Sequence, residues 1–153
     1  MADVFSQLYI HLVFAPAQRM ALINPEWEER LYKYITGIVE TRNHKMLAIG
    51  GMPDHIHFFV GLKPSESISE LVKAIKVSSN EFIKSEKLSK YSFNWQNGYG
   101  AFSHSRSQLH TVCKYILGQK EHHKKKNFKE EFLKICEDFN IEFDRKSMFE
   151  FFN

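Results

Sequence analysis

The chain has 153 residues, of which 43% are hydrophobic and 25% are charged, and its formal net charge is +3 at pH 7. This composition is typical of one globular domain over residues 1–153, and it excludes a disordered or low-complexity chain. The net charge is too small to indicate a nucleic-acid partner by itself.

Charge is distributed unevenly along the chain. Residues 63–134 hold 14 basic and 7 acidic side chains, whereas the remaining residues carry a net charge of −4. One half of the molecule is therefore basic enough to bind a polyanion. A solvated surface rich in lysine explains the same pattern.

The cysteines and the apolar runs bear on the cellular compartment. Cys113 and Cys136 form neither a metal-type pair nor a disulfide framework, which is typical of reduced thiols. The N-terminal segment lacks the features of a signal peptide, and no apolar run approaches the ~20 residues that span a bilayer. We therefore expect a soluble cytoplasmic protein with no membrane partner.

The first part of the chain predicts a strand, a helix and two more strands. Alternation over residues 8–14 predicts a half-buried strand with Leu12 on one face and His11 on the other. A helix is expected to begin at Asn24–Pro25, because Asn is a favoured N-cap and Pro suits the first helical position. Short strands are expected over Met46–Ile49 and Ile56–Val60, with turn-forming residues between them.

The rest of the chain predicts a further helix and strand, followed by appended helices. Ser67 and Glu70 form a capping box that opens an amphipathic helix, and Gly98–Phe102 leads into a fourth strand. A tyrosine-bearing helix is expected over about residues 107–125, and a shorter one near residues 129–139. The order is that of the ferredoxin-like, RRM-like split βαβ arrangement, an α+β fold in which two helices cover one face of an antiparallel sheet.

Two histidines share one face of the third predicted strand. In His55-Ile56-His57 the side chains alternate, so both imidazoles project together while Ile56 points at the helix-packed core. Two imidazoles at this spacing can chelate one metal ion. A polar sheet face exposed to water is the alternative explanation.

The helix predicted at residues 107–125 carries Tyr115 outside its apolar stripe. Gln119 lies one turn later on the same face, and His122 shares that face whereas His123 does not. An amide oxygen ligand beside a hydroxyl nucleophile suits phosphoryl transfer, with a metal on the phosphate oxygens and Tyr115 attacking phosphorus. A tyrosine that simply packs is the alternative.

The order of these motifs resembles that of a known family. Pro53-Asp54 precedes His55-Ile56-His57, the segment Trp-Gln-Asn-Gly-Tyr-Gly-Ala-Phe-Ser follows at residues 95–103, and the series ends with Tyr115-Ile116-x-x-Gln119-x-x-His122-His123. In this order and at this length, the chain resembles the single-tyrosine HUH transposases of the smallest bacterial and archaeal insertion sequences. It departs from that family at Gly118, where Asn is common.

The resemblance implies a metal-dependent endonuclease and strand transferase that acts on single-stranded DNA. Tyr115 would attack a phosphodiester, form a 5′-phosphotyrosine link and free a 3′-hydroxyl. His55, His57 and Gln119 would hold Mg²⁺ or Mn²⁺, and no nucleotide cofactor would be needed. Family members are homodimers in which the tyrosine helix of one subunit can serve the histidine pair of the other, and they recognise hairpins near the element ends.

Two expectations concern the partners of this chain. The sheet face that bears the histidine pair is expected to lack helices of its own, so that a helix of a partner subunit would cover it. Single-stranded DNA would suit the basic half of the molecule, with four candidate phosphate contacts in Lys73, Lys76, Lys84 and Lys87. The solvated face of an amphipathic helix explains the same lysines.

Three other functions compete with transposition. A related single-strand nickase with a domesticated role would keep the chemistry of Tyr115 without moving an element. A catalytically silent nucleic-acid-binding module would bind DNA and lose nothing when Tyr115 is replaced by Phe. A metal-binding protein with no DNA role would not bind single strands.

Overall fold

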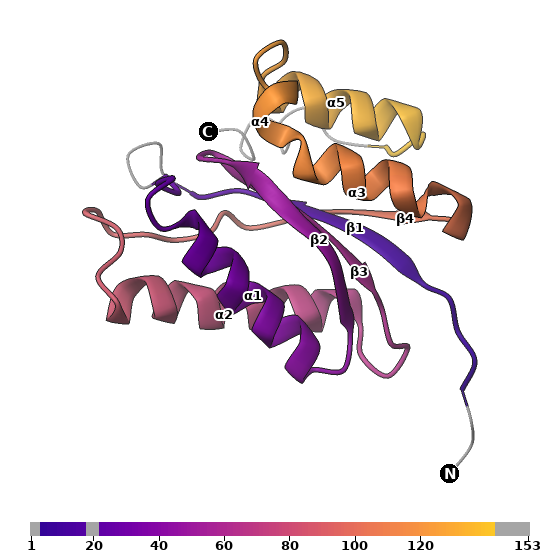
Figure 1. Ribbon diagram of the computed structural model, residues 1–153, viewed down its shortest axis with the longest axis horizontal. Coiled ribbons are helices and arrows are strands. Elements are labelled where there is room, and N and C mark those ends of the chain that lie inside the picture. The colour runs from indigo at the N-terminus through magenta and orange to yellow at the C-terminus, as the bar shows by residue number, and fades with distance from the viewer. Residues whose placement is uncertain (1–3, 18–21, 143–153) are drawn as a thin grey trace.

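The computed structural model describes residues 4–17 and 22–142, which form an antiparallel sheet with helices on both faces (Figure 1). The strands pair in the order β2-β3-β1-β4, so β3 and β1 are central. Their bounds are β1 (Tyr9–Phe14), β2 (Lys45–Met52), β3 (His55–Gly61) and β4 (Gly100–His104). Residues 143–153 of the predicted domain lie outside the described residues.

The helices divide between the two faces of the sheet (Figure 1). One face is covered by α1 (Glu28–Thr41) and α2 (Ile68–Ser85), and the other by α3 (Leu109–Leu117), α4 (Gln119–His122) and α5 (Phe128–Asp138). A 3₁₀ turn, η1 (Arg106–Gln108), joins β4 to α3. The predicted α+β fold, with two helices on one face and a tyrosine-bearing helix after the last strand, is confirmed. None of the described helices is long and apolar enough to cross a membrane.

The face under α1 and α2 holds the main apolar core. Ile56, Phe58 and Val60 of β3 point to this face and are completely buried. They pack with Leu31 of α1 and Ile75 of α2, among other apolar side chains. Each such side chain contributes about 1.5–3 kcal/mol when it leaves water, so this face supplies most of the driving force for folding.

The start of α1 differs from the prediction, whereas the start of α2 agrees with it. Asn24 does not cap α1, because its side-chain oxygen accepts a hydrogen bond from the Glu26 N–H at 2.8 Å and holds a turn at residues 25–27. The helix begins three residues after Pro25, at Glu28. The capping box is confirmed, since Ser67 Oγ accepts a hydrogen bond from the Glu70 N–H at 3.1 Å.

The continuous helix predicted over residues 107–125 is wrong in extent. Gly118 has φ −93° and ψ 16°, which lies outside the α-helical region, so α3 ends at Leu117 and α4 begins at Gln119. The α4 segment then ends at His122. The break matters for the site because it changes which side chains face the sheet beyond Gly118.

The expectation that the histidine-bearing face lacks helices of its own is also wrong, because α3, α4 and α5 of the same chain cover it (Figure 1). Two small apolar clusters attach them to the sheet. Val112 and Ile116 of α3 pack on Phe59, and two phenylalanines of α5 pack on Val13 and Phe102. The chain therefore buries this face without a partner subunit.

Close approach of α3 to the sheet depends on a glycine in β2. A Cβ atom at Gly50 would lie 2.5 Å from the carbonyl oxygen of Ile116. Since Ile116 directly follows Tyr115, the absence of a side chain at Gly50 sets how near the tyrosine comes to the histidine pair.

Candidate active site

The histidine pair lies in the centre of the sheet, beneath α3, α4 and α5. Because side chains alternate along β3, His55 and His57 face away from the main core, and both are completely buried. Their ring centroids are 5.0 Å apart. The predicted pairing of the two imidazoles on one strand face is confirmed.

Each of the two imidazoles makes a hydrogen bond through its Nδ1 atom. His55 Nδ1 lies 2.7 Å from Asp54 Oδ1, and His57 Nδ1 lies 2.8 Å from His11 Nε2 of β1. Both Nε2 atoms are thereby directed toward α4 and α5. Burial would raise the pKa of Asp54, but its hydrogen bond with His55 outweighs burial and lowers it. An ionised Asp54 beside His55 is the arrangement that orients metal-binding histidines.

Burial acts differently on the charges of the two histidines. It lowers the pKa of His57 to about 4, so that imidazole is neutral at pH 7. Burial opposes protonation of His55 as well, but hydrogen bonds with Asp54 and Glu131 outweigh it and raise the pKa to about 9. Without a metal ion, His55 therefore carries the positive charge of the cluster.

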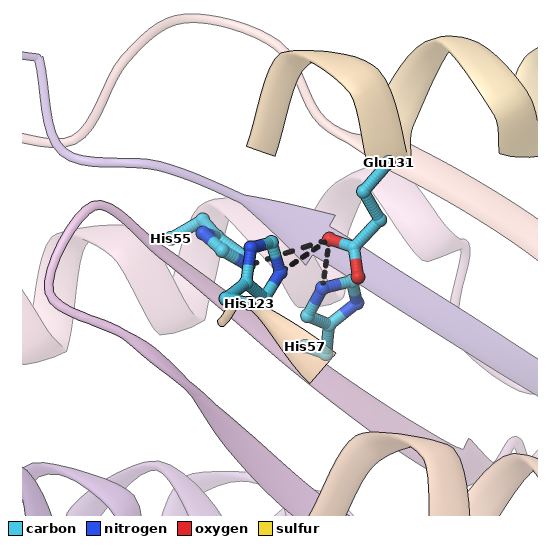
Figure 2. A group of neighbouring side chains, drawn as sticks. All are labelled: His55, His57, His123 and Glu131. Carbon is cyan, nitrogen blue, oxygen red and sulfur yellow. Dashed lines mark hydrogen bonds and ion pairs between the residues drawn. The ribbon is translucent and has the colours of Figure 1, made fainter. Parts of the chain in front are cut away.

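A carboxylate from α5 lies at the meeting point of the imidazoles. Figure 2 shows Glu131 directed at His55, His57 and His123, with Oε1 at 3.4, 2.9 and 3.2 Å from their Nε2 atoms. The Glu131 side chain is 2% exposed. Although burial opposes ionisation, hydrogen bonds from His55, His57 and Tyr115 hold the pKa of Glu131 well below its usual range. The glutamate is therefore an anion inside the protein.

Tyr115 and Gln119 reach the same carboxylate from the helices above the sheet. The Tyr115 hydroxyl and the Gln119 amide both donate to Glu131 Oε2, the latter at 3.1 Å. Gln119 Oε1 lies 3.1 Å from His55 Nε2. Burial and the negative charge of Glu131 raise the pKa of Tyr115. The structure thus brings His55, His57, Tyr115 and Gln119 together within one chain.

The donor atoms of this cluster fit a divalent metal ion. The Nε2 atoms of the three histidines and a carboxylate oxygen of Glu131 all lie within 4.8 Å of one another. His123 Nε2 is buried and lies 3.2 Å from Glu131 Oε1, so a third imidazole nitrogen faces the same carboxylate. Imidazole and carboxylate ligands together suit transition metals such as Mn²⁺.

Three members of the cluster were not among the predicted site residues. Glu131 follows the apolar spacing of Phe128, Phe132 and Cys136, and an acid within the apolar face of a short helix was the available signal. His11 was noted only for its strand face. His122 shares the face of Tyr115, as expected, with ring centroids 5.2 Å apart. His123 does not, but its side chain is 5% exposed and its ring centroid lies 4.6 Å from that of His55.

The four candidate lysines are not part of this cluster. Lys73, Lys76 and Lys84 lie on α2 and Lys87 just after it, on the opposite side of the sheet from the histidines (Figure 1). Lys73, Lys84 and Lys87 are exposed. Lys76 is half-buried, and its ammonium donates to the carbonyls of Gln96 and Gly98 at 2.7 and 2.6 Å. Lys76 therefore holds a loop, and DNA contact by any of the four lysines stays a prediction.

Comparison with protein families gives a match over most of the chain. Residues 4–119 match the family described as "Transposase IS200 like". The ISDra2 transposase TnpA of Deinococcus radiodurans is 25% identical over 118 residues, which is 74% of this chain and 84% of that protein. The family match includes the histidine pair, Tyr115 and Gln119, and it ends before His123 and Glu131.

Solved structures show the same fold. A crystal structure described as a candidate transposase from Deinococcus radiodurans R1 aligns with a TM-score of 0.60 and 22% identity, over 76% of this chain and 93% of that one. A REP-associated tyrosine transposase bound to a REP hairpin aligns with a TM-score of 0.56 and 14% identity, over 76% and 70%. At these identities the likeness concerns the fold alone.

Proposed function

The chain belongs to the IS200-like transposase family, and from this premise we propose that it cleaves and rejoins single-stranded DNA at the ends of an insertion sequence, with Tyr115 as the nucleophile. The observation that carries the proposal is the position of the Tyr115 hydroxyl, which donates to the same carboxylate that contacts both histidines. A tyrosine that only packed would not need its hydroxyl inside a cluster of metal-type donors.

The proposed reaction exchanges one phosphodiester for another. The Tyr115 hydroxyl oxygen attacks phosphorus and loses its proton, and the bond from phosphorus to the 3′-oxygen breaks. The 3′-oxygen takes up a proton and leaves as a hydroxyl, while the 5′-phosphate stays on Tyr115. Attack by another 3′-hydroxyl on the phosphotyrosine reverses these steps and rejoins the DNA. The bond energy is kept throughout, so no nucleotide cofactor is required.

His55, His57 and Gln119 are proposed to hold the divalent ion, Mg²⁺ or Mn²⁺, that this chemistry uses. When bound, the ion would polarise the scissile phosphate and offset its negative charge. The protein's own contribution is orientation, because Asp54 and His11 direct both Nε2 atoms to one point. Gln119 adds a neutral amide oxygen 3.1 Å from His55 Nε2.

Hairpins in single-stranded DNA are the proposed recognition element, and a homodimer is the proposed assembly. Support for a hairpin comes from the structurally similar REP-associated transposase, which is bound to one. The exposed lysines of α2 are proposed to contact phosphates away from the site, and the reaction is proposed to take place in the cytoplasm. Contact of the Tyr115 hydroxyl and both histidines with Glu131 within one chain supports a dimer in which each subunit uses its own tyrosine.

The covalent intermediate tests this function. The protein is incubated with labelled single-stranded oligonucleotides that span the gene's flanking hairpins and the bases outside them, with Mn²⁺, with Mg²⁺ or with chelator. A denaturing gel is expected to show a metal-dependent protein–DNA adduct, and Tyr115→Phe removes the adduct while it leaves DNA binding in place. Binding without any adduct would show a silent DNA-binding module instead. Mobilisation of a marked element in cells separates a transposase from a nickase.

A further inference from the structure

Glu131 is an unusual residue for its position on α5. It lies in the same helix face as Phe128 and Phe132, which pack against the sheet, and its side chain is 2% exposed. An ionised carboxylate away from water is costly unless charged or hydrogen-bonding groups surround it. Its nearest polar groups belong to the candidate active site, together with His122, whose Nε2 lies 3.4 Å from Oε2. The position of Glu131 is therefore explained by the site and not by the packing of α5.

The donor atoms around Glu131 Oε1 lie close enough together to share one ion. The separations from Oε1 to the Nε2 atoms of His55, His57 and His123 are 3.4, 2.9 and 3.2 Å. All four donor atoms lie within 4.8 Å of one another. Neighbouring ligands of one metal ion, each about 2.0–2.2 Å from it, lie about 2.8–3.6 Å apart.

Two further observations concern the orientation of the imidazoles. His123 Nε2 is buried and faces the carboxylate of Glu131, and its ring centroid lies 4.6 Å from that of His55. His55 donates its Nδ1 proton to Asp54, because a carboxylate can only accept, and this fixes Nε2 as the atom that faces the cluster. In metal sites, a ligating histidine commonly donates its other ring N–H to a carboxylate, which orients the ring.

We propose that Glu131 and His123 are additional protein ligands of the ion that His55, His57 and Gln119 are proposed to hold, so that three imidazoles and a carboxylate surround it together with the amide oxygen. The inference rests on the proposed function, and it deepens it by adding ligands from a part of the chain beyond the family match, which ends at residue 119. Three imidazole ligands favour Mn²⁺ over Mg²⁺, since Mg²⁺ prefers oxygen ligands and water.

The same carboxylate would connect the ion to the nucleophile. Oε1 of Glu131 faces the imidazoles, and Oε2 accepts the hydrogen bond from the Tyr115 hydroxyl. Glu131 would therefore position Tyr115 with respect to the metal. Glu131 lies on α5, so the packing of α5 against the sheet would be required for Tyr115 to be positioned correctly.

Mn²⁺ affinity tests the proposal with a matched pair of variants. Glu131→Gln keeps the size of the side chain and removes its charge, and Glu130→Gln makes the same change at an exposed neighbour on α5. Isothermal titration calorimetry is expected to show at least about tenfold weaker Mn²⁺ binding for Glu131→Gln, and affinity equal to the starting protein for Glu130→Gln. His123→Ala is expected to weaken binding similarly, and His110→Ala, on the exposed side of α3, is not. Equal affinity for all four variants would overturn the proposal.

A crystal of the unaltered protein grown with Mn²⁺ keeps the test valid even if a variant fails to fold. Anomalous scattering is expected to place the ion within about 2.0–2.4 Å of Glu131 and of the Nε2 atoms of His55, His57 and His123. An ion on His55 and His57 with Glu131 turned away would overturn the inference and leave the proposed function intact. No ion at the histidine pair, together with no Mn²⁺ binding in calorimetry, would contradict the metal site of the proposed function as well.

Discussion

The two faces of β3 bury opposite kinds of side chain. Toward α1 and α2 it presents Ile56, Phe58 and Val60, which gain free energy by leaving water. Toward α3, α4 and α5 it presents His55 and His57. These side chains lose their hydrogen bonds to water and replace them only in part with hydrogen bonds to other side chains. Both sets are completely buried. Burial alone therefore does not distinguish stabilising residues from functional ones, whereas the chemistry of what is buried does.

The largest expected effect on stability comes from truncating a side chain of the apolar face. Phe58→Ala removes a completely buried ring that packs edge-on against Phe14, with ring centroids 5.7 Å apart. We expect the free energy of unfolding to fall by about 3–5 kcal/mol, because both apolar burial and close packing are lost. Urea denaturation followed by circular dichroism measures the change. A loss below about 1 kcal/mol would mean that this face is not the main core.

The next residue along β3 tests the other face. His57→Gln is expected to lower the rate of single-strand cleavage by about 10²–10³-fold, the size of the effect when one preorganised electrostatic group is removed from an active site. The fold should lose less stability than with Phe58→Ala, since Gln retains a polar group for His11 and Glu131. Cleavage rates and urea denaturation are measured on both variants. Loss of stability without loss of cleavage in His57→Gln would reverse the roles assigned to the two faces.

Replacing Gly50 or Gly37 by Ala adds one methyl group on one side of the sheet or the other, and the two effects on stability can be compared. Gly50→Ala places a Cβ atom 2.5 Å from the Ile116 carbonyl oxygen, so we expect α3 to be pushed outward, at a cost of about 1–3 kcal/mol and with slower cleavage. At Gly37 of α1 no described atom lies within 4 Å of the added group. Gly37→Ala should therefore stabilise the protein by about 0.5–1 kcal/mol. Thermal denaturation of both variants checks the opposite signs.

Two lysines of α2 are expected to differ in their effects on stability, and the smaller effect belongs to Lys73. Lys76→Met removes the ammonium that donates to the carbonyls of Gln96 and Gly98, and we expect a loss of about 1–3 kcal/mol in stability. Lys73→Met should leave stability unchanged, because Lys73 is exposed. If Lys73 contacts a phosphate, its replacement lowers the slope of log affinity against log salt by about one. An unchanged slope would remove Lys73 from the DNA interface.

Local patterns were sufficient to predict the parts of the fold that depend on near neighbours. Alternation placed His55 and His57 on the face opposite Phe58, and a capping box located the start of α2. Tyr115 and Gln119 could be paired because they lie one helical turn apart. The start of α1 was misplaced because the side chain of Asn24 closes a turn before the helix, and both a turn and a cap use the same residue type.

Features that depend on tertiary contacts were missed. Glu131 is 74 residues from His57 in the chain, and no local spacing relates them. His123 reaches the site through His55 and Glu131, which lie on β3 and α5, so its position relative to Tyr115 gives no sign of these contacts. The cover of the histidine face by α3, α4 and α5 depends on small apolar clusters whose members come from four strands and two helices. Such clusters become visible only once the sheet order is known.

The most direct test of the account is to identify the residue that carries DNA after cleavage. The adduct formed on a single-stranded substrate with Mn²⁺ is digested with nuclease and trypsin and analysed by mass spectrometry. We predict a 5′-phosphonucleotide on the hydroxyl of Tyr115, within the tryptic peptide of residues 115–120. A nucleotide on any other residue, or cleavage that leaves no covalent link to the protein, would contradict the claim that the face beneath α3, α4 and α5 is the site of strand cleavage.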